Sequence, residues 1–324
     1  MPVEILYAAG CIPIDLNNLF VTSQSASAFI DTAEKCGFPR TCCSWTKGIY
    51  GAVRHYGIKR VVFAVQGDCS NNHALAQMLE YEGVECIPFA FPYRRDESEM
   101  EAQLNKFAAF FGLDMREAEH WRRELEPMRE AARRIDSLTW RECKVHGIEN
   151  HLWLVSAGDF CSDPANYAAG AGEFLEEARH RDAIQCPVRI GLVGVPPIVP
   201  EILEFLESRG AHVVFNETSR QFAMPSGGIT LRRQYSDYTY PYGIVCRLKD
   251  IRRETERRGL DGLIHYVQSF CFRRIEDKVL REAVQVPVIT LEQDRPGPIS
   301  GQLKTRLEAF VELLASRKKG LRIF

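Results

Sequence analysis

Short apolar runs alternate with segments of helical spacing along most of the chain. Runs of this kind, when turn residues bound them, are typical of buried strands, and the spacing between them is that of amphipathic helices. The predicted strands are residues 3–9, 61–65, 84–89, 187–195, 211–215, 262–267 and 286–291, and the clearest predicted helices are residues 23–35, 73–80, 199–208, 250–258 and 305–315. This alternation predicts an α/β fold.

The middle of the chain breaks the alternation, because residues 97–181 show helical spacing and no strand pattern. We therefore expect an N-terminal α/β domain at residues 1–95, a helical segment at residues 96–186 that packs on it, and a C-terminal α/β domain at residues 187–324. A polar and aromatic stretch follows the predicted strand at residues 211–215. We expect it to be a long loop, with tyrosines that line a pocket or pack the loop itself: Tyr238, Tyr240 and Tyr242.

Two of the predicted strands end in the same pattern, Val-Gln-x-x-Cys, at residues 65–69 and 267–271. The repeat predicts two similar domains, each with a thiol at the carboxyl end of a strand, Cys69 in one and Cys271 in the other. In open α/β sheets this edge is where ligands bind. His265 and Gln268 lie near the same edge and are weak candidates for catalytic groups, although His265 also suits a hydrogen-bonded core position. Gln66, Asn17 and Asn18 are weaker candidates for the same surroundings.

The composition describes an ordinary globular protein. Apolar residues make up 45% and charged residues 26%, and the net charge of −2 predicts no strong attraction to nucleic acid or to an anionic membrane. The sequence shows no apolar run long enough to span a bilayer and no signal-peptide pattern, so we expect a cytoplasmic protein. In a reducing compartment the 11 cysteines do not favour a disulfide framework. They are instead core residues, metal ligands or reactive thiols.

Nucleotide-binding signatures are missing from the sequence. There is no Gly-x-x-x-x-Gly-Lys-Ser/Thr loop, and the glycines at 191 and 194 lack the spacing of a dinucleotide loop. Any ATP chemistry would therefore belong to a partner. There is also no Cys-x-x-Cys pair, which argues against a zinc ribbon, a ferredoxin-like cluster and a thioredoxin-type redox pair.

Cys42 or Cys43 adds a third thiol, at the start of a predicted helix whose amino terminus favours the thiolate. Three thiolates from Cys69, Cys271 and this position would bind an iron–sulfur cluster and leave one iron without a protein ligand, as catalysis at a metal requires. Zinc binding, or burial as inert core cysteines, also fits the pattern.

Several segments resemble the 2-hydroxyacyl-CoA dehydratase family, which includes the benzoyl-CoA reductase subunits. They are the segment at residues 4–13, the cysteine before Ser44-Trp45-Thr46-Lys47-Gly48, Gly67-Asp68-Cys69, Ser269-Phe270-Cys271 and the segment at residues 305–310. The resemblance runs in order along nearly the whole chain. It implies two Rossmann-like, flavodoxin-like domains with parallel sheets and a helical insertion between them.

The resemblance also implies a cofactor and a reaction. Cys43, Cys69 and Cys271 would hold a 4Fe–4S cluster between the domains, with Cys43 preferred to Cys42 because it directly precedes the Ser-Trp-x-Lys-Gly segment. In this family a separate ATP-hydrolysing iron–sulfur activator donates one low-potential electron to the cluster. An acyl-CoA substrate then loses its 2-hydroxyl group through a ketyl radical, and related members carry out low-potential reductions.

Two other functions remain open from the sequence. The chain would be a non-catalytic partner subunit that pairs with a homologous catalytic chain, in a heterodimer or a homodimer. It would otherwise be a stand-alone reductase with a double-cubane 8Fe–9S cluster, held by six cysteines: Cys11, Cys42, Cys43, Cys69, Cys246 and Cys271. The substrate, and whether coenzyme A binds this chain, are not specified by the sequence.

Overall fold

The computed structural model describes residues 1–320 and divides into two compact units. The first unit contains Met1–Glu130, Ser156–Gly170 and Gln221–Tyr242. The second contains Ala131–Val155, Ala171–Arg220 and the chain from Gly243 onward. The units therefore interleave along the sequence. The three continuous domains predicted from the sequence stay a prediction.

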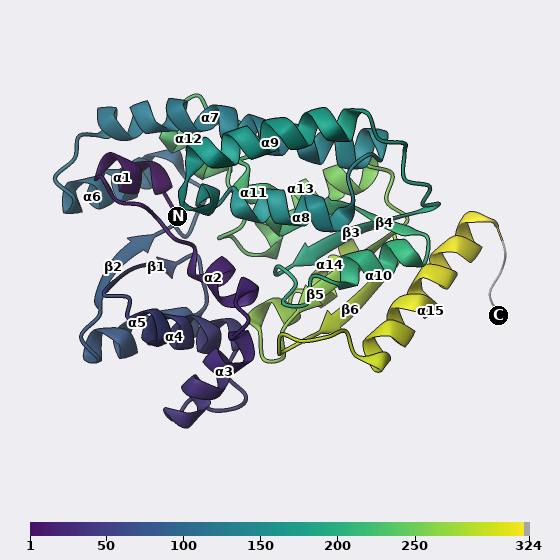
Figure 1. Ribbon diagram of the computed structural model, residues 1–324, viewed down its shortest axis with the longest axis horizontal. Helices are drawn as coiled ribbons and strands as arrows, with labels where there is room; N and C mark the ends of the chain where they lie inside the picture. Colours follow the sequence, from purple (N-terminus) through teal and green to yellow (C-terminus); the bar gives the residue numbers. More distant parts are fainter. Residues whose placement is uncertain (321–324) are drawn as a thin grey trace. The chain divides into compact units, whose positions relative to one another are not determined.

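The first unit has a two-stranded parallel sheet with helices on both faces. Strands β1 (Arg60–Gln66) and β2 (Glu85–Ala90) pair from Arg60↔Glu85 to Ala64↔Phe89. One face packs on α4 (Ser44–Tyr56) and α5 (Ser70–Tyr81), and the other on α1 (Val3–Ala8), α6 (Glu97–Phe110) and α12 (Leu231–Asp237). Figure 1 shows α1 and α6 on one side of this sheet and α4 and α5 on the other. The remaining helices of the N-terminal stretch are α2 (Leu16–Thr22) and α3 (Ala26–Lys35).

The segment at residues 3–9 is a helix, so the predicted first strand is wrong. Val3, Ile5 and Leu6 are buried, as the strand prediction required, but they are buried on the short helix α1. Glu4 is also fully buried in this run, and its carboxylate accepts hydrogen bonds from Gln234 and Tyr235. A short apolar run does not distinguish a buried strand from a buried helix.

The predicted long loop before Tyr242 is also wrong, because this stretch contains α11 (Glu217–Phe222) and α12. The side chain of Thr230 caps α12 by accepting the N–H of Arg233. The arginines of α12 pair with acidic residues of α6, through Arg232 with Glu101 and Arg233 with Glu97. These partners are remote in sequence, which is why local composition suggested a loop.

The helical middle of the chain is confirmed. Between β2 and residue 188, the described residues form helices without a strand: α6, α7 (Met115–Ser137), the π-helical turn η1 (Leu138–Glu142), α8 (Gly147–Ser156), the 3₁₀ turn η2 (Phe160–Ser162) and α9 (Pro164–Arg179).

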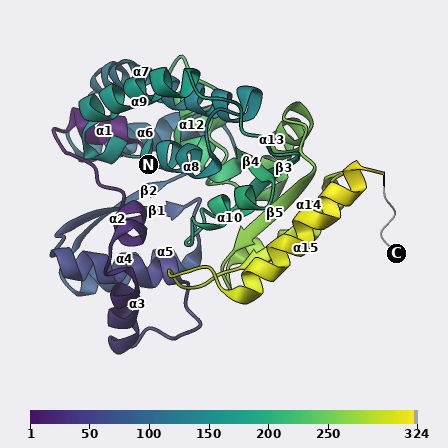
Figure 2. The ribbon, with the colours of Figure 1, turned by 45° about the vertical axis from the view of Figure 1, so that its right-hand side comes forward.

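The second unit contains a four-stranded parallel sheet in the order β4-β3-β5-β6. Its strands are β3 (Val188–Gly194), β4 (Ala211–Asn216), β5 (Gly262–Val267) and β6 (Val288–Glu292). One face packs on α13 (Ile244–Arg257) and α14 (Asp277–Ala283), and the other on α10 (Ile202–Ser208) and α15 (Gly301–Lys318). Figure 2 shows α15, in yellow, running along this sheet. The α/β class with parallel sheets is therefore confirmed, while the finer Rossmann-like arrangement stays a prediction.

The strand order places a switch point in the second unit. After β3 the chain adds β4 on one side, and it later adds β5 on the other side. Ligands of open α/β sheets bind outside the carboxyl ends of the two strands at such a point. Here these are the ends of β3 and β5, and β5 leads directly to Cys271.

Candidate functional site

Cys43 lies at the N-cap of α4, in the first unit. The N–H of Lys47 donates to the Cys43 carbonyl at 3.1 Å, which begins the helix at this cysteine. The buried Lys47 ammonium donates to Glu34 at 2.8 Å and to the Arg40 carbonyl at 3.1 Å. Lys47 therefore anchors the loop that precedes Cys43.

Gly48, in the same motif, allows two helices to approach closely. A Cβ added at Gly48 would lie 2.4 Å from the Phe20 ring on α2. The ring of Trp45 packs edge-on against Phe20, with centroids 5.7 Å apart. The Ser-Trp-x-Lys-Gly segment is thus explained by packing that fixes the backbone at Cys43.

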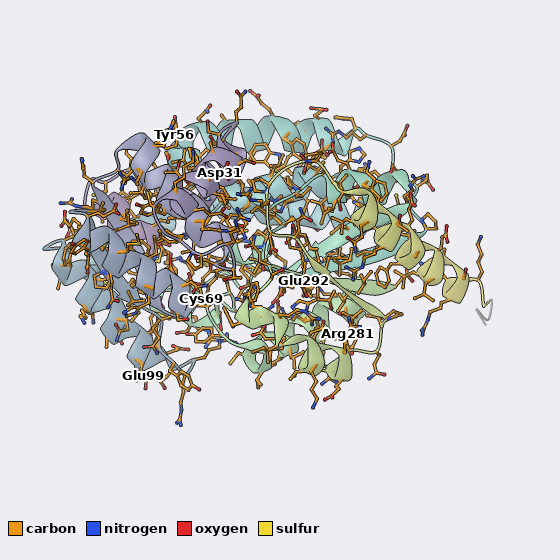
Figure 3. The ribbon with its side chains drawn as sticks, turned by 90° about the horizontal axis from the view of Figure 1, so that it is seen from below. Asp31, Tyr56, Cys69, Glu99, Arg281 and Glu292 are labelled. Carbon is orange, nitrogen blue, oxygen red and sulfur yellow. The ribbon has the colours of Figure 1, made fainter. Side chains whose placement is uncertain are left out.

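Cys69 lies at the N-cap of α5, after the turn that ends β1. Gly67 in this turn has φ +90°, and an added Cβ would lie 2.8 Å from Pro241 and 2.9 Å from Phe91. The Asp68 carboxylate accepts the N–H of Cys69 at 2.7 Å. Figure 3 labels Cys69. The turn therefore requires glycine, and the aspartate orients the backbone of the cysteine.

Cys271 occupies the matching position in the second unit, after β5 and before the 3₁₀ turn η3 (Phe272–Arg274). Its N–H donates to the Gln268 carbonyl at 3.1 Å, and its own carbonyl accepts the N–H of Arg274 at 2.9 Å. Phe270 has φ +61°, an uncommon conformation for a non-glycine residue. Burial raises the pKa of the Cys271 thiol, while the backbone N–H and the charge of Arg273 act in the opposite direction.

The three cysteines singled out from the sequence share one local geometry. Each is half-buried, and each is the N-cap residue of a following helical segment: Cys43, Cys69 and Cys271. Cys43 and Cys69 belong to the first unit, and Cys271 belongs to the second. Within residues 1–320, no group of three His, Cys, Asp or Glu side chains is arranged to hold a metal ion. The donor chemistry nevertheless fits an iron–sulfur cluster, since cysteine thiolates are the ligands that hold such clusters.

The additional cysteines have distinct surroundings. Burial raises the pKa of Cys42, and the charge of Lys47 acts against this. The Cys11 thiol faces the Ala9 carbonyl at 3.9 Å. Cys246 lies in the first turn of α13, and the N–H of Ile244 in this turn donates to Glu276, five residues after Cys271, at 3.1 Å.

The first unit contains a cavity of about 470 Å³. Its wall is formed by β1 residues 60–64, by residues 11–17 and by aromatic side chains that include Phe222, Tyr238 and Tyr240. Gly67 and Asp68, directly before Cys69, also lie in the wall. Of the three tyrosines predicted to line a pocket or to pack the loop, Tyr238 and Tyr240 lie in the cavity wall. Asn17, a weaker candidate from the sequence, also lies in this wall. Tyr242 instead packs against Arg95, whose guanidinium carbon lies 5.8 Å from the ring centroid.

Asp159 is a buried carboxylate in the cavity wall that sequence reasoning missed. It accepts the backbone N–H of Asp15 at 2.7 Å and that of Cys161 at 3.0 Å. Burial raises the pKa of this carboxyl to about 6. Nothing in the local pattern around residue 159 indicates burial, because one of its two partners, Asp15, comes from a distant segment.

His265 is almost completely buried within β5. Its Nδ1 lies 3.0 Å from Oδ1 of Asp277. Oδ1 of this carboxylate also accepts a hydrogen bond from Thr290, and Oδ2 accepts one from Arg281. Burial lowers the pKa of the imidazole, and the hydrogen bond and charge of Asp277 act in the opposite direction. Figure 3 labels Arg281 on α14. These contacts describe a hydrogen-bonded core histidine, and a catalytic role for His265 stays a prediction.

Gln268 is also buried, and its backbone carbonyl bonds the N–H of Cys271. A catalytic role for its side chain likewise stays a prediction. Glu292, labelled in Figure 3, ends β6 and pairs with Arg274 at 2.6 Å. The segment around Cys271 is therefore fixed by Gln268, which precedes the cysteine, and by the ion pair of Arg274, which follows it.

A buried ion-pair network supports the same segment and was not predicted. Arg247 on α13 donates twice to Glu217, at 2.7 Å each, and once to Glu276 at 2.5 Å. Glu217 also accepts the N–H of Gly194, at the end of β3, at 3.1 Å. Burial acts to raise the pKa of Glu217, but the charge and hydrogen bonds of Arg247 lower it overall. The network joins the ends of β3 and β4 to the residues after Cys271.

Comparison with known families decides the classification. The family model HGD-D, described as 2-hydroxyglutaryl-CoA dehydratase, D-component, matches residues 1–314. The chain belongs to this family. A comparison with individual curated proteins finds no match.

Membership of the D-component family confirms the resemblance seen in the sequence. It indicates dehydratase-type enzyme chemistry, and the description names one component of a larger system. All three N-cap cysteines lie within the matched residues. Among residues 1–320, none of the helices combines the length and apolar character needed to cross a membrane.

Proposed function

We propose that this chain is the iron–sulfur subunit of a 2-hydroxyacyl-CoA dehydratase-like system. Cys43, Cys69 and Cys271 would hold a 4Fe–4S cluster, which a separate ATP-dependent activator charges. The reaction is radical dehydration, or a low-potential reduction, of an acyl-CoA-type substrate in the cytoplasm. A homologous chain is the expected second subunit.

The observation that supports this proposal best is the shared geometry of the three cysteines. Cys69 and Cys271 each follow the carboxyl end of a parallel strand, where α/β proteins bind ligands, and Cys43 begins a helix. Half-buried thiols in these positions are suited to metal ligation, whereas a purely structural cysteine needs no such position.

The residues around each cysteine have a positioning role. Lys47 fixes the loop before Cys43, Gly67 and Asp68 shape the turn before Cys69, and the Arg247 network secures the segment after Cys271. When bound, the cluster would supply a low-potential electron and an iron with an open position. The absence of a phosphate-binding loop agrees with an ATP site on another protein.

Iron and sulfide analysis of protein purified without oxygen tests this proposal. We expect about four irons per chain and the broad visible absorption of an iron–sulfur protein. Cys69→Ala combined with Cys271→Ala should lose the iron, whereas the exposed cysteines Cys36→Ala and Cys161→Ala should leave it unchanged. Protein without iron that cannot be reconstituted, or a double variant with full iron content, would rule the proposal out.

The placement of Cys246 supports a larger cluster as the second candidate. Glu276 joins the turn that carries Cys246 to the segment that follows Cys271, and Cys42 directly precedes Cys43. A double-cubane 8Fe–9S cluster would give about eight irons per chain. In the same assay, Cys246→Ala should then remove iron, whereas a 4Fe–4S protein would be insensitive to this change.

A further inference from the structure

Two cysteines that the proposed function does not use lie at adjoining turns of the second unit. Cys143 is the C-cap of η1, with φ +53°, and Cys186 lies two residues before β3. A positive φ is uncommon for a residue other than glycine and is often kept at functional positions. Both cysteines are half-buried, and neither is in a disulfide. A small reagent can therefore reach both thiols.

Backbone hydrogen bonds bring the two turns together. The N–H of Ile184 donates to the Cys143 carbonyl at 2.7 Å. The N–H of Cys186 donates to the Ile184 carbonyl at 3.1 Å, so the chain folds back within two residues. Ile184 thus bonds the backbones of both cysteines.

The side chain of Arg189 adds a second connection. Arg189 lies on β3, three residues after Cys186. Its guanidinium donates to the Trp140 carbonyl at 2.7 Å and to the Cys143 sulfur at 3.6 Å, and its Nε donates to the Arg258 carbonyl at 2.8 Å. Reactive cysteines are typically partly exposed and lie beside cationic groups, and Cys143 has both features.

The two sulfurs are also close enough to affect each other. Burial raises the pKa of Cys186 to about 11, and the charges of Glu207 and of Cys143 act in the same direction. Charges more than about 10 Å apart are largely screened, so these groups lie near the Cys186 sulfur. The Glu207 carboxylate is itself fixed in the turn after Cys143, by the N–H of Gly147 and by His146, at 2.7 Å each. Cys186 therefore packs beside the turn that Cys143 begins.

We propose that Cys143 and Cys186 are a redox-responsive pair that forms a disulfide when the protein meets a low-molecular-weight disulfide, such as oxidised glutathione. Rotation of the two side chains would bring the sulfurs to the bonding distance of about 2 Å. Disulfides of this kind in reducing compartments are usually transient and sense the redox state. The pair is separate from the cysteines assigned to the cluster, so the proposal goes beyond the proposed function.

The exchange takes place in two steps. Cys143 reacts first, because its sulfur lies beside Arg189 whereas the raised pKa keeps Cys186 a thiol. Cys143 attacks the oxidant, forms a mixed disulfide and releases one small thiol. Cys186 then attacks the Cys143 sulfur and releases the second small thiol. Two cysteine thiols are oxidised to one disulfide, the oxidant is reduced to two thiols, and the cysteine protons end on these two thiols.

The bond would close a loop that contains α8, η2 and α9. Within this loop the chain leaves the second unit after Val155 and returns to it at Ala171, because Ser156–Gly170 belongs to the first unit. A disulfide removes conformational freedom from the unfolded loop. Oxidation would therefore fix both ends of this segment within the second unit.

Peptide mapping without reductant tests the proposal on the full chain, purified without oxygen. Glutathione buffers of rising oxidised fraction, at about pH 7.5, should join the Cys143 peptide to the Cys186 peptide. The effective molarity of the pair should be at least about tenfold higher in the folded chain than in the chain unfolded in urea. Equal values would overturn the proposal, as would a Cys143 that carries only glutathione or is joined to another cysteine.

Single variants show which sulfurs react. Cys186→Ser should leave Cys143 with a bound glutathione, and Cys143→Ser should leave Cys186 a thiol. The matched controls Cys36→Ser and Cys161→Ser, at exposed positions, should keep the link. Circular dichroism would confirm that each variant is folded. A Cys186→Ser chain in which Cys143 forms a protein disulfide in undiminished yield would overturn the proposal. Iron content does not enter this test.

Discussion

At the scale of single residues, Cys43, Cys69 and Cys271 each begin a helical segment, and neighbouring side chains fix the backbone around them. The repeat of Val-Gln-x-x-Cys indicated Cys69 and Cys271 in the sequence, the helix start indicated Cys42 or Cys43, and the family resemblance favoured Cys43. Their role as cluster ligands stays a prediction. Asp159 was missed because its burial depends on Asp15, which lies 144 residues away. Tertiary contacts of this kind leave no local pattern.

Gly67 offers a test of the turn before Cys69. Gly67→Ala should destabilise the first unit by about 1–3 kcal/mol, because its φ is +90° and the new Cβ would meet Pro241 and Phe91. Gly83→Ala is the matched control, since Gly83 has φ +86° and no atom lies within 4 Å of an added Cβ. Urea unfolding measures both variants. Equal destabilisation would show that the contacts at Gly67 contribute nothing.

At the scale of elements, the sequence predicted the strands of the two sheets but did not predict the helices α1 and α12. The strands β1 to β6 were recognised because their apolar runs end at clear turns. The helix α1 was predicted as a strand because a short apolar run fits either element. The buried Glu4 within this run has its partners, Arg129 and Tyr235, far away in sequence. The helix α12 was taken for a loop because its arginines pair with α6, far away in sequence.

The ion pairs of Arg247 are expected to stabilise the elements near Cys271. Arg247→Met should destabilise the second unit by about 3–5 kcal/mol, because Glu217 would keep its burial and lose its charge partner. We also expect faster alkylation of Cys271, since the segment after it loses the bond to Glu276.

Arg252→Met is the control for this variant, because Arg252 lies on the same helix and is exposed. Its unfolding free energy should change by less than about 0.5 kcal/mol. Chemical unfolding and mass-spectrometric alkylation rates measure both effects. Similar losses in the two variants would show that the network has no special role.

At the scale of the whole molecule, buried histidines make stability depend on pH. Burial lowers the pKa of His151 to about 4, from 6.5 in an unfolded chain, and it also lowers the pKa values of His212 and His265. Below pH 6.5 the unfolded chain therefore binds protons that the folded chain does not. The contribution of these histidines to the free energy of unfolding is fully present above this pH. It is lost progressively as the pH falls from 6.5 towards 4.

Protonation of His151 in the unfolded chain should lower the free energy of unfolding by about 2 kcal/mol as the pH falls from about 7.5 to 5. Its Nδ1 lies 3.1 Å from both Ser219 and Asn216, so His151→Gln should lower stability at neutral pH and reduce the pH dependence. The exposed His120→Gln should change neither. Thermal unfolding across this pH range measures the effect, and an unchanged pH dependence in His151→Gln would contradict the assignment.

The buried contacts of Glu4 also bear on how the protein is made. Tyr235 donates to Glu4 across 231 positions of the sequence, and Arg129 joins the same pair. On the ribosome, Glu4 can reach this environment only after the 231 residues up to Tyr235 have been translated. Until then the buried site of Glu4 is incomplete, so this part of the first unit forms late during synthesis.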